Sequence, residues 1–261
     1  MFQAASILRE CVNIVRRSGE IIRARWAGPR HVRHKGGIDL VTETDLEVEA
    51  FLKKNLAGLL PEASFMAEES CVADQEPGAL CWIIDPVDGT TNFVHRIPQV
   101  GTSVALWREG RVVLGVVNTP MLEECFWAAR GQGAFCNNQP IAVSRADTLA
   151  GALVGTGFPY DVAERLPEVL ERLAAVLPVS QGVRRIGAAS VDLAYLACGR
   201  LDAFYEAGLK PWDLAAGWLL VEEAGGKVSN LRNEPLRFGE ALLASNGRLH
   251  DAMTALLAKT A

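Results

Sequence analysis

Two aspartates three positions apart are the first candidates for chemistry in this sequence. Asp85 and Asp88 follow the apolar run 80–84 and precede a Gly-Thr step at Gly89. A turn at this point can direct both carboxylates and the carbonyl of Val87 toward one spot. Oxygen ligands of this kind suit Mg²⁺ or Mn²⁺ better than zinc. The segment therefore predicts a site for a hard divalent cation.

The residues that follow the aspartates are suited to hold a phosphate. Gly89, Thr90 and Thr91 open a predicted helix. The first N–H groups of a helix have no partner within it, and together with the positive end of the helix they favour an anion. Glycine lets the backbone approach that anion closely. The segment thus combines a candidate cation site with a candidate phosphate site.

Two further acidic residues are candidate members of the same site. Glu68 follows the apolar pair Phe65-Met66 at the expected end of a strand, and Asp213 stands at the head of an apolar helix. Carboxylates within about 4 Å of one another would repel by roughly 4 kcal/mol per pair at an effective dielectric constant near 20. Divalent cations are the natural way to remove that repulsion.

Each acidic residue also has a plain structural interpretation. Asp213 alone suits a helix N-cap, and Glu68 beside Glu69 suits a solvated charge pair. A single Asp-x-x-Asp spacing recurs by chance. The combination of these acids with the Gly-Thr step favours one site over a set of unrelated turns and caps.

Helices and strands alternate in the elements that must position these residues. Apolar residues recur at helical spacing through residues 3–26. A second helix is expected to follow Thr44-Asp45, where either residue can act as the cap, and to run to Leu60. Strands are expected at 80–84, 102–107, 112–117, 125–129, 153–155 and 201–205. Further helices are expected at 163–176, at 214–224 and after Gly247. This pattern predicts mixed sheets layered with helices. No low-complexity linker divides the chain.

Length, composition and charge limit the class of protein. The chain has 261 residues, and 49% hydrophobic with 22% charged residues is the composition of an ordinary globular protein. Its 26 Lys and Arg and 31 Asp and Glu give a net charge of −5, which argues against a basic nucleic-acid clamp. Arg9, Glu10 and Arg16 interrupt any secretory signal, and no stretch approaches the ~18 apolar residues of a membrane span. We therefore expect a cytoplasmic protein without nucleic-acid or membrane partners.

Other catalytic motifs are weak. The six cysteines include no Cys-x-x-Cys pair, so we expect free thiols. Cys11 and Arg17 have the spacing of a cysteine phosphatase but lie on the first amphipathic helix, with no glycine loop between them. The four histidines show no metal-binding spacing, and no Gly-x-Ser-x-Gly elbow is present. The acidic residues remain the strongest candidates.

The sequence resembles the inositol monophosphatase family, within the magnesium-dependent, lithium-sensitive sugar phosphatases. The resemblance rests on Asp85-Pro-Val-Asp-Gly-Thr-Thr-Asn-Phe93 and on Trp212-Asp-Leu-Ala-Ala-Gly217 with its trailing Glu223-Ala-Gly-Gly226. Further blocks follow in family order at 40–45, 68–70, 131–136 and 184–189, so the resemblance spans the chain. It implies an α+β (mixed α/β) fold, a five-layer αβαβα sandwich. It also implies a single domain over residues 1–261, whose two αβ halves meet at the metal site, and a homodimer.

The resemblance also implies roles for individual residues. The implied metal ligands, for two or three Mg²⁺ ions or for Mn²⁺, are Glu68, Asp85, the Val87 carbonyl, Asp88 and Asp213. The implied phosphate contacts are Gly89 and Thr90. The residues implied to orient or deprotonate the attacking water are Glu68, Thr90 and Asp45. The implied substrate contacts are Asp88, Gly187, Ala188, Ala189 and Glu206.

The substrate within this family is the open question. Glu206 and the compact loop at 187–190 favour a small polyol such as myo-inositol monophosphate, because an acidic acceptor suits hydroxyls and repels a second phosphate. Arg184 and Arg185 keep open a 3′(2′),5′-bisphosphate nucleotidase, although a role in a dimer contact is an equal alternative. A histidinol-phosphate phosphatase is another alternative. A non-catalytic regulatory scaffold is an alternative from a different functional class. Such a protein would be expected to lose its metal ligands.

Overall fold

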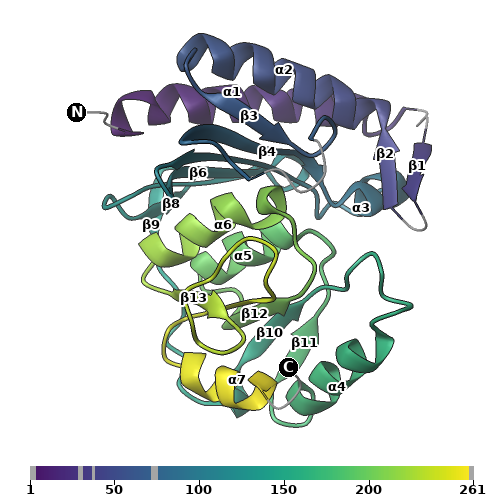
Figure 1. Ribbon diagram of the computed structural model, residues 1–261, viewed down its shortest axis with the longest axis vertical. Helices are drawn as coiled ribbons and strands as arrows, with labels where there is room; N and C mark the ends of the chain where they lie inside the picture. Colours follow the sequence, from purple (N-terminus) through teal and green to yellow (C-terminus); the bar gives the residue numbers. More distant parts are fainter. Residues whose placement is uncertain (1–3, 29–31, 37–38, 72–75, 259–261) are drawn as a thin grey trace.

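Helices and sheets alternate in five layers in the order αβαβα (Figure 1). The computed structural model of the chain describes residues 4–28, 32–36, 39–71 and 76–258. The expected mixed α+β fold is confirmed. The N-terminal helices form the layer at the top of Figure 1, and the C-terminal helix lies in the layer at the bottom.

The first two layers come from the N-terminal half. The outer helices are α1 (Ala4–Arg25) and α2 (Glu43–Leu59). They cover a seven-stranded sheet ordered β3 (Ser64–Ala67), β4 (Leu80–Asp88), β5 (Gly101–Arg108), β6 (Arg111–Thr119), β7 (Glu124–Ala129), β8 (Ala134–Cys136) and β9 (Gln139–Ile141). Strand β3 is parallel to β4, and the remaining neighbours are antiparallel. A hairpin of β1 (Val32–Gly36) and β2 (Asp39–Thr42) leads into α2, and α3 (Thr90–His95) follows β4.

The other three layers come from the C-terminal half. The central layer consists of α5 (Ala189–Ala197) and α6 (Pro211–Glu223). The second sheet is ordered β11 (Gly182–Arg184), β10 (Leu153–Thr156), β12 (Ala203–Glu206), β14 (Leu242–Ser245) and β13 (Lys227–Asn230). Its first three strands are parallel to one another, and the other pairs are antiparallel. The outer helices are α4 (Leu166–Val176) and α7 (His250–Leu257).

Apolar side chains fill the interfaces between the layers. Val15 and Leu52 of the outer helices pack in one cluster with Trp82 of the first sheet. Leu219 of α6 and Phe204 of β12 belong to the central cluster, which joins the inner faces of both sheets through α5 and α6. Each of these side chains is fully buried, and burial of a large apolar side chain stabilises the fold by about 1.5–3 kcal/mol.

At Gly115, strand β6 and helix α6 are in backbone contact. A Cβ atom at Gly115 would lie 2.8 Å from the carbonyl oxygen and 3.0 Å from the Cα of Ala216. We expect Gly115→Ala to lower the free energy of unfolding by about 2–3 kcal/mol, because backbone must move to admit the methyl group. Gly58→Ala is the control, since no atom lies within 4 Å of the added Cβ on helix α2. Urea denaturation should show the control unchanged or more stable by up to about 1 kcal/mol, and equal effects of the two substitutions would contradict the contact.

Two elements differ from expectation in ways that affect the site. The strand expected to stop at Ile84 continues to Asp88, with its pairing to β5 shifted between Asp85 and Asp88. Pro86 lies inside that irregular stretch, where a residue without an N–H is tolerated. The segment 187–190, expected as a loop, contains the start of α5 at Ala189. Helix α5 is buried on nearly all sides, so it shows no amphipathic period.

His250, at the start of α7, links two strands of the second sheet. Its Nε2 lies 2.8 Å from the Ser229 hydroxyl and its Nδ1 lies 3.0 Å from the Ser245 hydroxyl. Burial, with a contribution from Lys227, lowers the pKa of His250 from 6.5 to about 4. The unfolded chain therefore binds a proton near pH 6.5 that the folded chain does not accept until about pH 4.

This pKa predicts a loss of stability in mild acid. His250 contributes its full stabilisation above about pH 6.5, and up to about 3 kcal/mol is lost as the pH falls from there to about 4. Urea denaturation of the wild type and of His250→Gln at several pH values measures this difference. The variant should lack this part of the pH dependence, and parallel curves for the two proteins would contradict the assignment.

Candidate active site

The parallel pairing of β3 with β4 places Glu68 beside Asp85. In this register Ala67 lies opposite Ile84, and the Glu68 amide donates to the Ile84 carbonyl at 3.1 Å. The next residue after each of these is acidic, and Glu68 helps to raise the pKa of Asp85. The expected position of Glu68 after the end of a strand is confirmed.

Hydrogen bonds from the backbone orient the two aspartates of β4. Asp88 lies at the N-terminus of α5, where its Oδ2 accepts from the Ser190 amide at 2.7 Å and from the Ser190 hydroxyl at 2.5 Å. A negative charge is favourable there, because the first N–H groups of a helix are unpaired. Asp85 Oδ1 accepts from the Val87 amide at 3.0 Å. These bonds fix one oxygen of each carboxylate and leave the other as a candidate ligand.

Strand β5 connects the acidic part of β4 to helix α6. Ser103 lies opposite Asp85 in the sheet, and its hydroxyl donates to the Trp212 carbonyl at 3.0 Å. Asp213 is the next residue, and its Oδ2 accepts from the Lys210 amide at 2.7 Å. Asp213 therefore caps its own helix, from the third helical position rather than from the N-cap. The same contacts bring it to the acidic residues of β3 and β4.

Burial and mutual repulsion raise the pKa of these carboxyl groups. The pKa of Asp85 lies well above its usual range, because the group is buried and faces Glu68, Asp88 and Asp213. Burial also raises the pKa of Asp213, with contributions from Glu68 and Asp88. Burial raises the pKa of Asp88 to about 6, although the hydrogen bonds from Ser190 act in the opposite direction. The cluster therefore favours protons or cations among its members.

The donor set of this cluster fits a divalent cation. Every candidate ligand is an oxygen atom, and a positive ion would offset the repulsion that contributes to the raised pKa values. Across the ranges that the structure describes, no three acidic, histidine or cysteine side chains already converge in the spacing of a formed metal centre. Asp85, Asp88 and Asp213 each have one oxygen bonded to a backbone amide instead. The predicted ligands thus share one region, and metal binding itself stays a prediction.

Asp45 and Thr90 meet although they are 45 positions apart. The Thr90 hydroxyl lies 3.0 Å from Asp45 Oδ1 and 3.0 Å from the Val87 carbonyl, and its single hydrogen can serve only one of them well. Asp45 Oδ2 accepts from the Thr42 amide at 3.0 Å. The expected helix start after a cap at Thr44 or Asp45 is two or three residues too late, because Thr42 caps α2 and Asp45 completes a capping box. Burial raises the pKa of Asp45 to about 6.

Gly89 forms the turn between β4 and α3. Its φ of 87° lies in the left-handed region that glycine adopts without strain. A Cβ atom there would lie 3.1 Å from the Ala188 Cβ and 3.2 Å from the Gly187 carbonyl oxygen. The predicted phosphate loop therefore packs against the predicted substrate loop. Thr90 begins α3, as expected.

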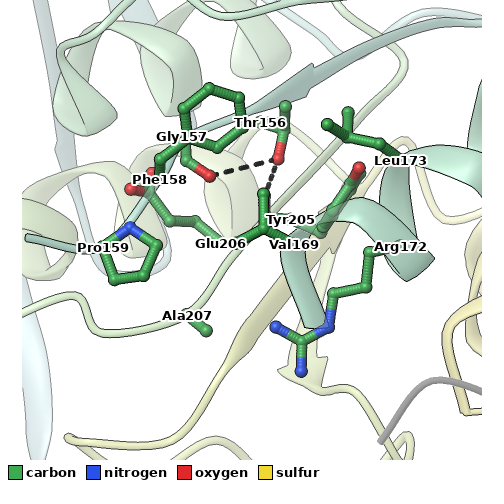
Figure 2. A pocket seen from close by; sticks show the side chains of 10 residues that line it. All are labelled: Thr156, Gly157, Phe158, Pro159, Val169, Arg172, Leu173, Tyr205, Glu206 and Ala207. Atoms are coloured by element: carbon green, nitrogen blue, oxygen red, sulfur yellow. Dashed lines mark hydrogen bonds between the residues drawn. The ribbon is translucent and has the colours of Figure 1, made fainter. Parts of the chain in front are cut away.

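Glu206, at the end of β12, lies on the side of the site formed by the second sheet. Its carboxylate packs against Gly157, where an added Cβ atom would lie 2.1 Å from both carboxylate oxygens. Figure 2 shows Phe158 and Glu206 toward one end of a small pocket between β10, β12 and α4. Burial raises the pKa of Glu206 to about 8, with Asp88 acting in the same direction and Arg185 against it.

Two polar residues of this region had not been expected from the sequence. Ser190 holds the carboxylate of Asp88. Asp192, in the first turn of α5, is 1% exposed, and its Oδ1 has no hydrogen-bond partner in the described part of the chain. Burial, together with Glu206 and Asp88, raises the pKa of Asp192 well above its usual range. A lone acid in the run 188–197, which is apolar apart from Ser190 and Tyr195, is the signal that could have identified it.

Similar proteins are known by sequence and by structure. An inositol-1-monophosphatase from Synechocystis is 40% identical over 245 residues, which cover 93% of this chain and 85% of that protein. The Nus factor SuhB of Escherichia coli is 37% identical over 252 residues, covering 95% of this chain and 94% of that protein. The solved structure of inositol monophosphatase from Anabaena has a TM-score of 0.88 at 34% identity, covering 98% of this chain and 96% of that chain.

The αβαβα fold and the gathered carboxylates define a phosphatase of a class that is generally metal-dependent. Residues 4–261 match the profile of the inositol monophosphatase family. The chain belongs to this family. The resemblance stated from the sequence motifs is therefore confirmed, and so is the fold that it implies.

Proposed function

We propose that this protein is a Mg²⁺-dependent phosphomonoesterase that hydrolyses myo-inositol monophosphate, or a similar small polyol phosphate, to the alcohol and inorganic phosphate. The observation that carries the proposal is the meeting of a partly buried acidic cluster with the Asp45–Thr90 pair, since Glu68 acts on Asp45. Family membership supports the reaction, and the names of the relatives from Synechocystis and Anabaena support the substrate class.

The proposed metal ligands come from the end of β3, from β4 and from the start of α6. They are Glu68, Asp85, the Val87 carbonyl, Asp88 and Asp213. When bound, two or three Mg²⁺ ions, or Mn²⁺, supply a more acidic water and positive charge for the phosphate and the leaving alkoxide. The chain orients the ligand oxygens through hydrogen bonds from backbone amides, as outer groups do in many metal sites.

Glu68, Thr90 and Asp45 are proposed to orient and deprotonate the attacking water. A Thr90 hydroxyl that donates to Asp45 keeps lone pairs that accept a hydrogen bond from a water molecule. A carboxylate within reach of the same water can take its proton, a contribution of typically about 10²–10⁴-fold to the rate. In-line attack by this water requires no covalent phosphoenzyme.

The substrate is proposed to lie between the two halves of the chain. The Gly89 and Thr90 amides, at the start of α3, would contact the phosphate. The proposed contacts to the polyol are Asp88, Gly187, Ala188, Ala189 and Glu206. The close packing of Gly89 against Gly187 and Ala188 supports this arrangement, because it brings the phosphate and polyol contacts next to each other.

Phosphate release from three esters tests the substrate. We expect release chiefly from myo-inositol 1-phosphate, with loss of activity on removal of Mg²⁺ and inhibition by Li⁺. Faster release from adenosine 3′,5′-bisphosphate or from histidinol phosphate would support the nucleotidase or the histidinol-phosphate phosphatase instead. No release from any of the three would favour the non-catalytic regulatory scaffold.

Further proposals concern location and assembly. All six cysteines are free, which is typical of a reducing compartment and supports a cytoplasmic location. None of the helices within the described ranges is long and apolar enough to cross a membrane. We also propose one domain over residues 1–261 and a homodimer. Exposed Leu166 and Leu170 on α4, with Leu177 at its C-cap, offer apolar surface for a subunit contact. A single unfolding transition and sedimentation equilibrium test these two proposals.

A further inference from the structure

Arg184 and Arg185 are adjacent and both exposed, but they lie in different surroundings. Arg184 belongs to strand β11, and its Nη1 donates to the Val183 carbonyl at 3.1 Å. The guanidinium of Arg185 lies 5.5 Å from the centre of the Phe158 ring, a cation–π contact. A Cβ atom at Gly187 would lie 2.5 Å from Arg185 Nη1, so this guanidinium packs directly on the proposed substrate loop.

The surroundings of Arg185 include Glu206. Phe158, on which Arg185 stacks, lines the same small pocket as Glu206 (Figure 2). The positive charge of Arg185 lowers the pKa of Glu206 and of Asp192, opposite to the effect of burial. Arg185 therefore lies near both acids. Among the described residues, no carboxylate forms an ion pair with Arg185. Its N–H donors are therefore available to a ligand.

We propose that Arg185 is a specificity-determining residue that binds hydroxyl groups of the substrate together with Glu206. The inference rests on the proposed function and names the residue pair that selects a polyol. A guanidinium only donates hydrogen bonds, and a carboxyl group has an oxygen that accepts them whether or not the group carries a proton. A hydroxyl does both, so one hydroxyl can accept from Arg185 and donate to Glu206. An alcohol without hydroxyls at this position can satisfy neither group.

The charges near Arg185 favour hydroxyls over a second phosphate. Three acidic groups, Glu206, Asp192 and Asp88, interact with one another in this region, and Arg185 is the cation that acts on Glu206 and Asp192. A dianionic group placed here would meet one cation among three acidic groups, and each acid that is ionised would repel it. Arg185 therefore supports a polyol monophosphate rather than a nucleoside bisphosphate.

Steady-state kinetics of Arg185→Ala test this role. With myo-inositol 1-phosphate we expect KM to rise about tenfold and kcat to stay within about twofold, because a hydrogen bond present in both ground and transition states is lost. With p-nitrophenyl phosphate, which has no ring hydroxyls, both constants should be unchanged. Arg185→Lys keeps a donor of different geometry and should restore part of the affinity. Arg184→Ala removes the same charge at the next position and should leave both substrates unaffected.

A double variant tests whether one hydroxyl bridges the pair. The KM of Arg185→Ala/Glu206→Gln should not exceed that of the worse single variant, whereas independent contacts would multiply. If Arg185→Ala raises KM equally for both esters, or for neither, the inference is overturned and the proposed function stands. If Arg185→Ala does not fold, the same comparison is made with Arg185→Lys. A wild type that hydrolyses p-nitrophenyl phosphate but not the inositol ester overturns the proposed substrate and the inference together.

Discussion

Replacing Asp88 with asparagine is expected to lower phosphate release by more than about a hundredfold while the fold is retained. The substitution removes a proposed ligand charge, but the asparagine oxygen can still accept from the Ser190 amide that Asp88 binds at 2.7 Å. It also removes one of the charges that raise the pKa of Asp85 and Asp213. Without Mg²⁺ the variant should therefore be at least as stable as the wild type.

Phosphate release and urea denaturation, each with and without Mg²⁺, measure both effects. A ligand at 100 times its Kd stabilises a protein by about 2.7 kcal/mol, and this gain should be much smaller in the variant. Asp202→Asn is a matched control, because Asp202 is as buried as Asp88, each 8% exposed, but accepts from the Leu153 amide at 2.6 Å in the second sheet. It should lose stability and keep its response to Mg²⁺. Undiminished phosphatase activity in Asp88→Asn would remove Asp88 from the ligand set.

The local pattern of apolar residues predicted β4 but not its end. The strand was expected to stop at the first acidic residue, since a buried strand seldom continues into charge. It continues because the pairing with β5 resumes at Asp88, opposite Gly101, and because the Thr102 hydroxyl donates to the Pro86 carbonyl at 3.0 Å. Both causes are contacts with another strand, which no local pattern contains.

The acidic pair on β4 could be identified from its spacing, whereas its companions depend on tertiary contacts. Glu68 reaches Asp85 through the parallel register of β3 and β4. Asp213 is held near the pair by the hydrogen bond that the Ser103 hydroxyl donates to the carbonyl of the preceding residue, Trp212. Neither contact follows from the spacing of residues along the chain. The family motifs supplied these assignments in advance, because they record which distant segments occur together.

Three acids of the site also serve as helix caps. Asp45 completes the capping box of α2, Asp88 accepts from the first turn of α5, and Asp213 accepts from the Lys210 amide at the start of α6. The structural interpretation of such residues and the functional one are therefore compatible. Three helices begin at one place, and their unpaired N–H groups offset part of the repulsion among the carboxylates. Substitutions in this cluster should be made to asparagine, since alanine would remove a cap as well as a ligand.

Thr90→Val is expected to lower kcat by about 10²–10³-fold, because the proposed path from the attacking water to Asp45 passes through the Thr90 hydroxyl. Valine has nearly the same shape but lacks the hydroxyl that lies 3.0 Å from Asp45 Oδ1 and from the Val87 carbonyl. Thr90→Ser retains the hydroxyl and should keep most of the activity. Thr91→Val changes the next residue, which is exposed, and should behave like the wild type.

The coupling of Thr90 to Asp45 separates a role in catalysis from a role in packing. If the two residues act on the same water, the double variant Asp45→Asn/Thr90→Val should be no slower than the slower single variant. Their effects would multiply if they acted independently. The measurement is kcat for myo-inositol 1-phosphate at saturating Mg²⁺, with the unfolding midpoint of each variant as a check on the fold. A Thr90→Val enzyme with normal kcat would show that the hydroxyl supports only the turn at Val87, and Asp45 would then lose its proposed link to the water.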